Sequence, residues 1–358
     1  MKSEYMLATL LIACSVLCGA CSHDSDFGKE SEPILTTNSS PARGENEMKQ
    51  SDGYFTADTT VGEVIADPAF GDFGHLLFPV DRNVPASMTL AQVSTSNVYV
   101  WYSYISVDNT VEILNYLRNE AMSGKQIFYP IYSESEIAAD PSKADSGLFL
   151  FRGTERKPFA ITNAGGGFMY VGAMHDSFPH SLEISKAGYS AFALIYRPYD
   201  PYNDLARAIT YIHDNAAELG VKTDNYSLWG GSAGARMAAT LGNSSYLYQL
   251  TGRRDIPQAA AVIMQYTGYS TASQYEAPTY ACVGSNDGIA SWRTMLTRLQ
   301  RLSEMGIPNE FHVYDGLGHG FGLGHGTVAE GWINDALKFW QKNMKSGNST
   351  GFTPVHAD

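Results

Sequence analysis

Ser232 lies in the pattern Gly-x-Ser-x-Gly, where an apolar stretch meets an alanine-rich segment. This context predicts a strand, a very sharp turn and a helix, the arrangement called a nucleophile elbow. Gly230 and Gly234 lie two residues before and after the serine, where so tight a turn leaves room only for small residues. The hydroxyl would stand clear of the sheet, and the N–H of Ala233 would point at a developing oxyanion. The pattern therefore predicts that Ser232 is a nucleophile.

A glycine-rich segment lies upstream, directly after the apolar stretch 158–162, which has the character of a buried strand. Residues 163–168 read Asn-Ala-Gly-Gly-Gly-Phe. Consecutive glycines let the backbone approach a substrate closely and aim several N–H groups at one point. We expect Gly166 and Gly167 to donate these hydrogen bonds. A flexible glycine loop without this role is the alternative.

Two further loops carry an acid and a base. Asp287 follows the apolar run 278–283 in a turn-rich loop, where an Asn-Asp-Gly sequence can also simply close the turn. His319 follows the alternating segment 310–314 in a glycine-rich loop. The order serine, aspartate, histidine is one of the orders known for catalytic triads. His325 repeats the Gly-His-Gly setting, but we favour His319 as the base because it lies nearer the end of the strand.

A third interpretation takes His312, His319 and His325 together as metal ligands. Metal-binding histidines usually occur with Cys, Asp or Glu at close spacing on rigid elements. A glycine-rich loop would hold a metal poorly. We therefore expect no metal and no cofactor.

From about residue 125 to residue 344 the chain resembles an α/β-hydrolase of the esterase type. Besides the motifs above, it shares Tyr196-Arg197-Pro198 after a strand and a Gly-His-Gly-Phe-Gly loop at 318–322. It is similar to the acetyl-esterase and feruloyl- or acetylxylan-esterase-like branches, which have a Gly-Gly-Gly-Phe oxyanion loop. Ala164 replaces the histidine of the common His-Gly-Gly-Gly motif, and Gly231 replaces the aspartate of hormone-sensitive-lipase-like esterases. These departures indicate a different branch and leave the substrate open.

The resemblance implies a triad of Ser232, His319 and Asp287. His319 would take the serine proton as the hydroxyl attacks an acyl carbon, and Asp287 would orient the imidazole. Water would then hydrolyse the acyl-enzyme. The resemblance also implies an oxyanion hole formed by the N–H groups of Gly166, Gly167 and Ala233. Four aromatic residues could stack on a sugar ring or simply belong to the core or the pocket wall, namely Phe168, Tyr170, Tyr266 and Tyr269.

The expected fold class is α/β. The resemblance implies an α/β-hydrolase fold, with a doubly wound, mostly parallel sheet of about eight strands, helices on both faces and an N-terminal extension. Hydrophobic patterns predict strands near 127–132, 147–151, 159–162, 190–196, 225–229, 259–265, 279–283 and 310–314. They predict helices near 178–187, 204–219, 233–242, 289–305 and 328–344. Another helix is expected to begin at Asn109 or Thr110 and to end at Gly124.

The chain divides by composition into five expected parts. These are a signal peptide (1–20), a disordered linker (21–58), an extension packed on the core (59–125), the hydrolase domain (126–345) and a flexible tail (346–358). The aromatic-rich stretch 70–104 is expected to be irregular. The extension either forms part of the substrate mouth or covers the core.

The N-terminus indicates export. Lys2 precedes an apolar stretch over 6–20, which is too short to cross a bilayer and fits a secretory signal. The sequence Leu-Cys-Gly-Ala-Cys at 17–21 resembles a lipoprotein signal, in which Cys21 becomes the lipidated first residue. We expect a lipoprotein anchored in the bacterial outer membrane or cell surface. A secreted or periplasmic enzyme with an incidental Cys21 is the alternative.

The charge of the chain argues against nucleic-acid binding, and its cysteine content argues against a disulfide. The chain has 24 basic and 37 acidic residues and a net charge of −13, with no basic stripe, so nucleic-acid binding is not expected. Of its 4 cysteines, only Cys282 lies beyond the signal and the lipidation site. Cys282 is expected to pack as a small hydrophobic residue, without a disulfide.

Three functional hypotheses follow from these observations. The first is a serine carboxylesterase that hydrolyses short acyl esters, foremost acetyl esters, on carbohydrate. The second is a serine peptidase of the oligopeptidase type, and the third is a non-catalytic binding protein on a hydrolase scaffold. We favour the first, because the chain has no room for a propeller domain and retains serine, aspartate and histidine candidates.

Overall fold

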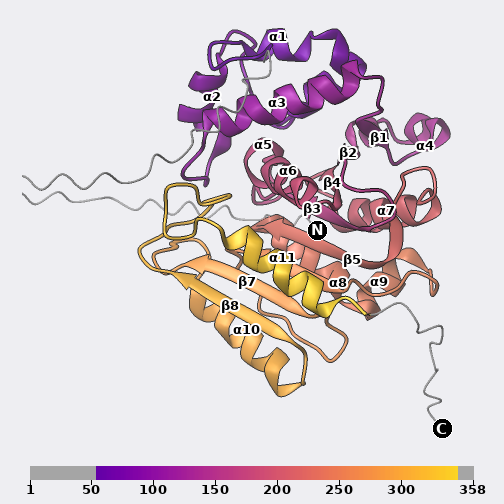
Figure 1. Ribbon diagram of the computed structural model, residues 1–358, viewed down its shortest axis with the longest axis vertical. Coiled ribbons are helices and arrows are strands. Elements are labelled where there is room, and N and C mark those ends of the chain that lie inside the picture. The colour runs from indigo at the N-terminus through magenta and orange to yellow at the C-terminus, as the bar shows by residue number, and fades with distance from the viewer. Residues whose placement is uncertain (1–53, 346–358) are drawn as a thin grey trace, which may run out of the picture. The chain divides into compact units, whose positions relative to one another are not determined.

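The computed structural model describes residues 54–345 (Figure 1). They belong to one compact unit, Asp52–Asp358, and the other unit, Met1–Ser51, lies outside the described residues. The expected signal peptide, the lipidation site Cys21, nearly all of the linker and the flexible tail also lie outside them. Within residues 54–345, no helix is long and apolar enough to cross a membrane.

An eight-stranded sheet forms the centre of the described unit, in the order β1-β2-β4-β3-β5-β6-β7-β8. The first two pairings, β1 with β2 and β2 with β4, are antiparallel, and all the others are parallel. The strands are β1 (Phe128–Pro130), β2 (Gly147–Phe151), β3 (Pro158–Asn163), β4 (Ser190–Ile195), β5 (Lys222–Gly231), β6 (Ala261–Gln265), β7 (Thr279–Gly284) and β8 (Asn309–Tyr314). Each overlaps a strand predicted from the hydrophobic pattern.

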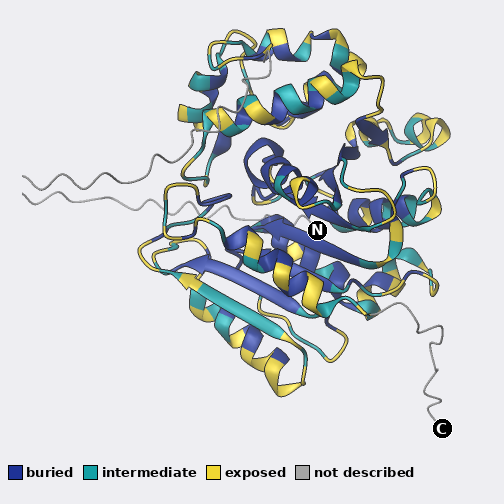
Figure 2. Ribbon diagram, viewed as in Figure 1, coloured by how far each residue is buried: buried dark blue, intermediate teal, exposed yellow. Residues whose placement is uncertain are grey.

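The central strands are buried on both faces. Every residue of β4, β6 and β7 is buried, as the dark strands of Figure 2 show. A parallel sheet covered on both faces requires such continuous apolar runs. The edge strand β8 is mostly half-buried, since it has a neighbouring strand on one side only.

Helices pack on the sheet in two sets. Helix α6 (Phe178–Lys186) packs on β4, and helix α11 (Trp332–Asn343) packs on β6. These two helices also contact each other. Helices α7, α8 and α9 contact one another, and α8 packs on β5 and β6. Helix α10 packs on β7 and β8. The core helices are α5 (Ala173–Asp176), α6 (Phe178–Lys186), α7 (Pro201–Asp214), α8 (Ala233–Gly242), α9 (Ser244–Thr251), α10 (Trp292–Glu304) and α11 (Trp332–Asn343). The short helices α5 and α9 were not predicted.

The segment before the sheet is more regular than its sequence indicates. It contains α1 (Val61–Ile65), η1 (Pro68–Leu77), α2 (Leu90–Thr95), η2 (Asn97–Tyr99) and α3 (Val107–Met122), and α4 (Glu134–Ala139) and η3 (Pro141–Asp145) follow β1. Capping boxes at Thr60 and Thr89 begin α1 and α2. The expectation of an irregular stretch was wrong here, because helices this short leave little periodicity in the sequence.

Helix α3 begins earlier than predicted. Its N-cap is Ser106, whose hydroxyl accepts a 3.2 Å hydrogen bond from the N–H of Asn109. The predicted caps, Asn109 and Thr110, therefore lie inside the first turn. The helix ends at Met122, before Gly124. Serine, threonine and asparagine are all good N-caps, so their order in the sequence does not decide which one caps the helix.

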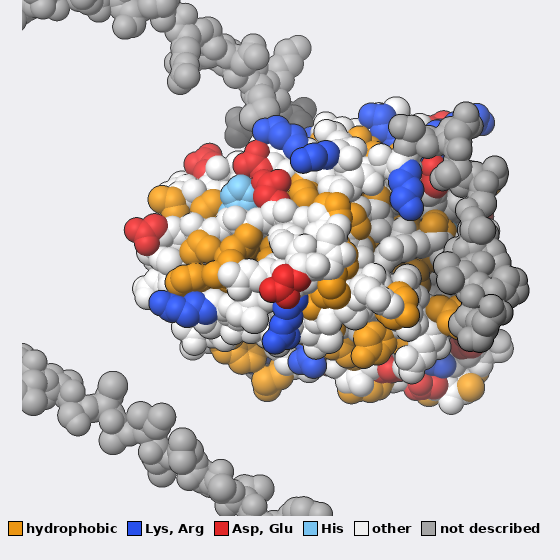
Figure 3. All heavy atoms as spheres, turned by 90° about the horizontal axis from the view of Figure 1, so that it is seen from below, with side chains coloured by type: hydrophobic (Ala, Val, Ile, Leu, Met, Phe, Trp, Pro, Cys, Tyr) orange, Lys and Arg blue, Asp and Glu red, His pale blue; other side chains and the backbone are white. Residues whose placement is uncertain are grey.

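Acidic and basic side chains are interspersed with apolar ones on the face drawn in Figure 3. Cys282 is fully buried in β7. Burial raises the pKa of its thiol well above the usual range, so the thiol stays protonated and packs as an apolar group.

Candidate active site

Ser232 lies in the sharp turn between β5 and α8. Its backbone has φ +51° and ψ −114°, a combination that L-residues adopt rarely. A Cβ on Gly230 would lie 2.2 Å from the carbonyl carbon of Gly234, and one on Gly234 would lie 2.0 Å from the carbonyl oxygen of Asn163. Both positions therefore require glycine, as the Gly-x-Ser-x-Gly pattern predicted.

The structure brings Ser232, His319 and Asp287 together in one chain of hydrogen bonds. The Ser232 Oγ lies 3.0 Å from Nε2 of His319, and Nδ1 of His319 lies 2.7 Å from Oδ2 of Asp287. The side chain of His319 is only 7% exposed, and that of Asp287 is fully buried. The three residues meet because β5, β7 and β8 run parallel, so the loops at their carboxyl ends share one edge of the sheet.

Asp287 also closes its own turn. Its Oδ1 accepts hydrogen bonds from the N–H groups of Ile289 at 2.8 Å and Ala290 at 2.7 Å. Asp287 therefore has both of the roles that the Asn-Asp-Gly sequence allowed. One carboxylate oxygen closes the turn, and the other faces His319. The turn fixes the direction in which the carboxylate points.

Among the described residues, the other two histidines of this region make no hydrogen bond to Ser232. His325 is exposed, and His312 pairs with Glu310 at 2.6 Å. Glycines with positive φ at 320, 322 and 324 turn the chain repeatedly between His319 and His325. Residues 54–345 contain no group of three or more His, Cys, Asp or Glu side chains that could hold a metal ion.

The glycine loop after β3 approaches Ser232 closely. Gly166 has φ +125° and Gly167 has φ +63°, and a Cβ on Gly166 would lie 2.1 Å from the carbonyl oxygen of Tyr170. A Cβ on Gly165 would lie 2.9 Å from Cβ of Ser232. Within the described residues, the N–H groups of Gly166, Gly167 and Ala233 donate to no protein acceptor. Ala233 belongs to the first turn of α8, where N–H groups lack partners within the helix.

Asp176 supports this loop and was not singled out from the sequence. Its buried carboxylate accepts hydrogen bonds from the Gly165 N–H at 2.7 Å, the Tyr102 hydroxyl at 3.0 Å and the Tyr266 hydroxyl at 2.5 Å. Burial, and secondarily the nearby Asp176 charge, raises the pKa of both tyrosines well above the usual range, so both remain donors. A Cβ on Gly231 would lie 2.3 Å from Asp176. The carboxylate therefore explains the glycine that precedes Ser232.

The four aromatic residues expected around the site differ in burial. Phe168 and Tyr269 are half-buried, and the ring of Phe168 lies 5.9 Å from that of Tyr202. Tyr170 and Tyr266 are fully buried. The Tyr170 hydroxyl donates to the carbonyl of Val100, and the Tyr266 ring lies 5.0 Å from that of His319. Tyr170 and Tyr266 are thus core residues, which is one of the two places expected for them, and do not line a substrate pocket.

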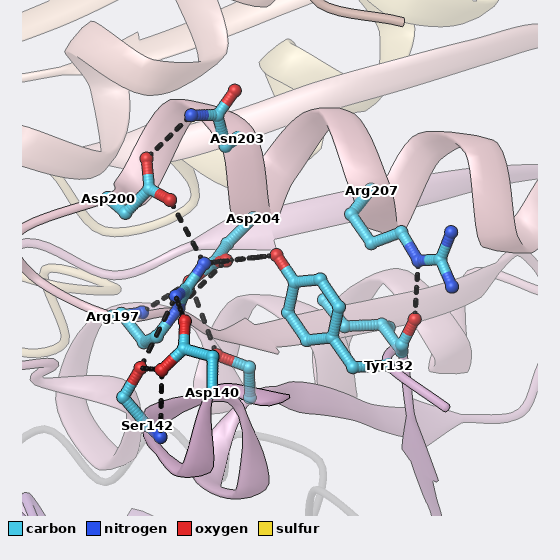
Figure 4. Close-up of polar contacts among 10 residues, drawn as sticks. Tyr132, Asp140, Ser142, Arg197, Asp200, Asn203, Asp204 and Arg207 are labelled. Atoms are coloured by element: carbon cyan, nitrogen blue, oxygen red, sulfur yellow. Dashed lines mark hydrogen bonds and ion pairs between the residues drawn. The ribbon is translucent and has the colours of Figure 1, made fainter. Parts of the chain in front are cut away.

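Tyr196 and Arg197 anchor the carboxyl end of β4. The Tyr196 hydroxyl donates a 2.7 Å hydrogen bond to the carbonyl of Ala164, the residue before the three glycines. Arg197 is buried and pairs with the fully buried Asp204 at 2.6 Å, and Tyr132 also donates to Asp204 at 2.5 Å (Figure 4). The pair fastens β4 to helix α7. It is therefore structural and keeps the oxyanion loop in place through Tyr196.

The strand order, the turn at Ser232 and the three loops at one sheet edge define an α/β-hydrolase fold, as the sequence predicted. The BD-FAE family matches residues 150–271, which is less than half of the chain. An AB hydrolase superfamily protein of Schizosaccharomyces pombe is 25% identical over 46% of this chain and 53% of its own length. The chain thus spans about half the length of this curated relative.

A solved structure shares this fold. An acetyl ester-xyloside bifunctional hydrolase from Caldicellulosiruptor lactoaceticus superposes with a TM-score of 0.52 and 21% identity, over 60% of this chain and 95% of that one. A carboxylesterase from Lactobacillus plantarum superposes with a TM-score of 0.49 and 18% identity, over 56% of this chain and 94% of that one.

Proposed function

We propose that this protein is a carboxylic ester hydrolase, and specifically a serine esterase that removes short acyl groups, foremost acetyl, from carbohydrate. The observation that carries the proposal is the hydrogen-bonded chain from Ser232 through His319 to Asp287, with distances of 3.0 Å and 2.7 Å. A serine next to a base that is itself oriented by a third group is the arrangement of an activated nucleophile.

The proposed reaction follows from this geometry. Nε2 of His319 takes the proton of the Ser232 hydroxyl as Oγ attacks the ester carbonyl, and Asp287 stabilises the imidazolium that forms. The unpaired N–H groups of Gly166, Gly167 and Ala233 stabilise the tetrahedral oxyanion. His319 then gives the proton to the leaving alcohol, and water hydrolyses the acyl-enzyme in the same manner.

The support for the substrate comes from the comparisons with known proteins. The structural relative from Caldicellulosiruptor lactoaceticus is described as an acetyl ester-xyloside hydrolase, and the BD-FAE match covers the strands that carry Gly166 and Ser232. These resemblances favour an acetylated sugar as the substrate. We take the half-buried ring of Phe168, which directly follows the three glycines, as part of the proposed pocket wall.

The test compares hydrolysis of 4-nitrophenyl acetate, 4-nitrophenyl butyrate and an aminoacyl-4-nitroanilide by the wild type and by Ser232→Ala. We expect the wild type to hydrolyse acetate faster than butyrate and to leave the anilide intact. Ser232→Ala should lose at least about 10⁴-fold in kcat, because the nucleophile is removed. Labelling of the wild type, but not of the variant, by a fluorophosphonate would assign the activity to this serine.

Two other outcomes would favour a peptidase or a binding protein. Cleavage of the anilide in preference to the esters would indicate a peptidase. A folded wild type that neither turns over an ester nor reacts with the fluorophosphonate would contradict the proposal and leave a binding protein.

We further propose that the enzyme is exported and anchored through lipid on Cys21. The support is the sequence Leu-Cys-Gly-Ala-Cys at 17–21, in which an apolar stretch of signal-peptide length ends. Metabolic labelling with a radioactive fatty acid should mark the wild type in a bacterial host, and Cys21→Ser should be unlabelled. Equal labelling of the two proteins would contradict the anchor.

A further inference from the structure

A segment of the N-terminal extension, Val100–Ser103, lies between the two loops that flank Ser232. On one side, the Tyr170 hydroxyl donates to the carbonyl of Val100. On the other side, the Ser103 hydroxyl donates to the carbonyl of His319 at 2.7 Å, and the Ser103 N–H donates to the carbonyl of Gly320 at 3.0 Å. The extension is therefore hydrogen-bonded to the loop of the base as well as to the oxyanion loop.

Trp101, at the centre of this segment, lies against the oxyanion loop. A Cβ on Gly167 would lie 2.9 Å from Cζ3 of the Trp101 ring. A Cβ on Gly320, the neighbour of His319, would lie 2.4 Å from the carbonyl oxygen of Trp101. The indole thus lies beside a proposed oxyanion donor, and its backbone touches the loop that carries the base.

The conformation of Trp101 differs from that of a core residue. Its φ is +75°, a value that is rare and unfavourable for a bulky side chain. Its side chain remains 41% exposed, although tryptophan is usually well buried. The four hydrogen bonds made by Tyr170, Ser103 and Tyr102 hold the segment in place. The chain therefore maintains an unfavourable backbone that leaves an aromatic surface exposed beside the reacting group.

The ring of Trp101 is also supported from one side. It stacks on the ring of the buried Tyr170 with 6.0 Å between centroids and 21° between planes. Arg82 lies over the Tyr170 ring at 5.3 Å. Met169, which precedes Tyr170 in the chain, is 63% exposed. The exposed Trp101 ring and the buried Tyr170 ring thus form an aromatic platform.

We infer that Trp101 forms a sugar-binding subsite, which stacks on the pyranose ring of the alcohol part of an acetylated glycoside. The inference rests on the proposed esterase function and names the part of the enzyme that recognises the sugar. A pyranose presents a face of C–H groups that packs on a flat aromatic ring, and tryptophan offers the largest such ring at low entropic cost. The position beside Gly167 would hold this ring while the ester carbonyl lies at Ser232.

The test uses two acetyl esters that differ in the presence of a sugar. Acetate release is measured for methyl tri-O-acetyl-β-xylopyranoside and for ethyl acetate, with the wild type, Trp101→Gly and Trp101→Phe. Glycine adopts φ +75° without strain, so Trp101→Gly removes the ring and should keep the fold. We expect KM for the xyloside to rise about tenfold in Trp101→Gly, and kcat/KM for the xyloside to fall about tenfold more than kcat/KM for ethyl acetate. Trp101→Phe should recover most of the affinity.

The matched control is Tyr104→Gly. Tyr104 belongs to the same stretch, has φ +57° and is 59% exposed. The variant Tyr104→Gly should leave the hydrolysis of both esters unchanged. Melting temperatures of all variants would verify that they fold. If Trp101→Gly lowers both activities equally, or neither, the subsite is refuted while the esterase function stands. If the wild type hydrolyses neither ester, both proposals fail.

Discussion

The N–H of Gly165 donates a 2.7 Å hydrogen bond to Oδ2 of Asp176. Gly165 is the first of the three glycines in the oxyanion loop, so this bond sets the direction in which the next two N–H groups point. Because the same carboxylate also accepts from Tyr102 and Tyr266, it joins the loop to the extension and to the strand next to the nucleophile. Asp176 thus acts on the site through Gly165 and is a positioning residue.

Replacement of this carboxylate should therefore impair the chemical step. We expect Asp176→Asn to lower kcat for 4-nitrophenyl acetate about 10- to 100-fold with KM nearly unchanged, because misplaced oxyanion donors affect the transition state most. Tyr102→Phe removes one of three donors and should cost less than about fivefold. Steady-state kinetics, with circular dichroism to verify folding, measure both. An unchanged kcat in Asp176→Asn would show that the loop holds its shape without the charge.

Replacing His319 and replacing His325, which lie in similar Gly-His-Gly sequences, should have very different effects on kcat. His319→Gln should lower kcat at least about 10⁴-fold, because Nε2 of His319 is the group placed 3.0 Å from Ser232. His325→Gln, on an exposed residue, should stay within twofold. Parallel ester assays of the two purified variants provide the comparison. A large loss in His325→Gln would favour a different arrangement of this loop in the working enzyme.

Acid should destabilise the protein through the buried His175. Burial lowers the pKa of His175 to about 3, and its Nε2 has no partner among the described residues. Between pH 6.5 and 3 the unfolded chain binds a proton that the folded chain does not, so stability falls as the pH falls. The loss is about 1.4 kcal/mol per pH unit for this group. Burial also lowers the pKa of His180, which adds in the same direction.

The measurement is urea unfolding at pH 7, 6, 5 and 4.5. His175→Leu should flatten the dependence of the unfolding free energy on pH, because leucine cannot bind the proton in the unfolded state. An identical slope in the variant and the wild type would mean that another group controls acid stability.

The buried pair between Arg197 and Asp204 should matter for stability more than any surface pair. Asp204→Ala leaves the Arg197 guanidinium without its buried partner, and we expect a loss of about 3–5 kcal/mol in unfolding free energy. The exposed pair of Lys338 and Asp335 supplies the control, since Lys338→Ala should cost less than about 1 kcal/mol. Chemical denaturation measures both losses. Equal losses would contradict a special role for the buried pair.

Much of the architecture could be predicted from local patterns. Strand β7 was expected at 279–283 and spans Thr279–Gly284, because a strand buried on both faces must be a continuous apolar run. The start of α3 was misplaced, because several adjacent residues can cap a helix and only Ser106 has the right position. The short helices α5 and α9 were missed, because one or two turns leave too little periodicity.

The sequence by itself determined the chemistry available in each loop: a serine in a glycine turn, glycines that free backbone N–H groups, and an acid and a base after apolar strands. These features arise from interactions within a few residues, which sequence patterns record. Only the tertiary structure decided which groups meet. It placed His319 rather than His325 beside Ser232, and it brought Tyr102 to Asp176, 74 residues away. Contacts between distant segments depend on how the elements pack around the sheet, and no local pattern encodes that packing.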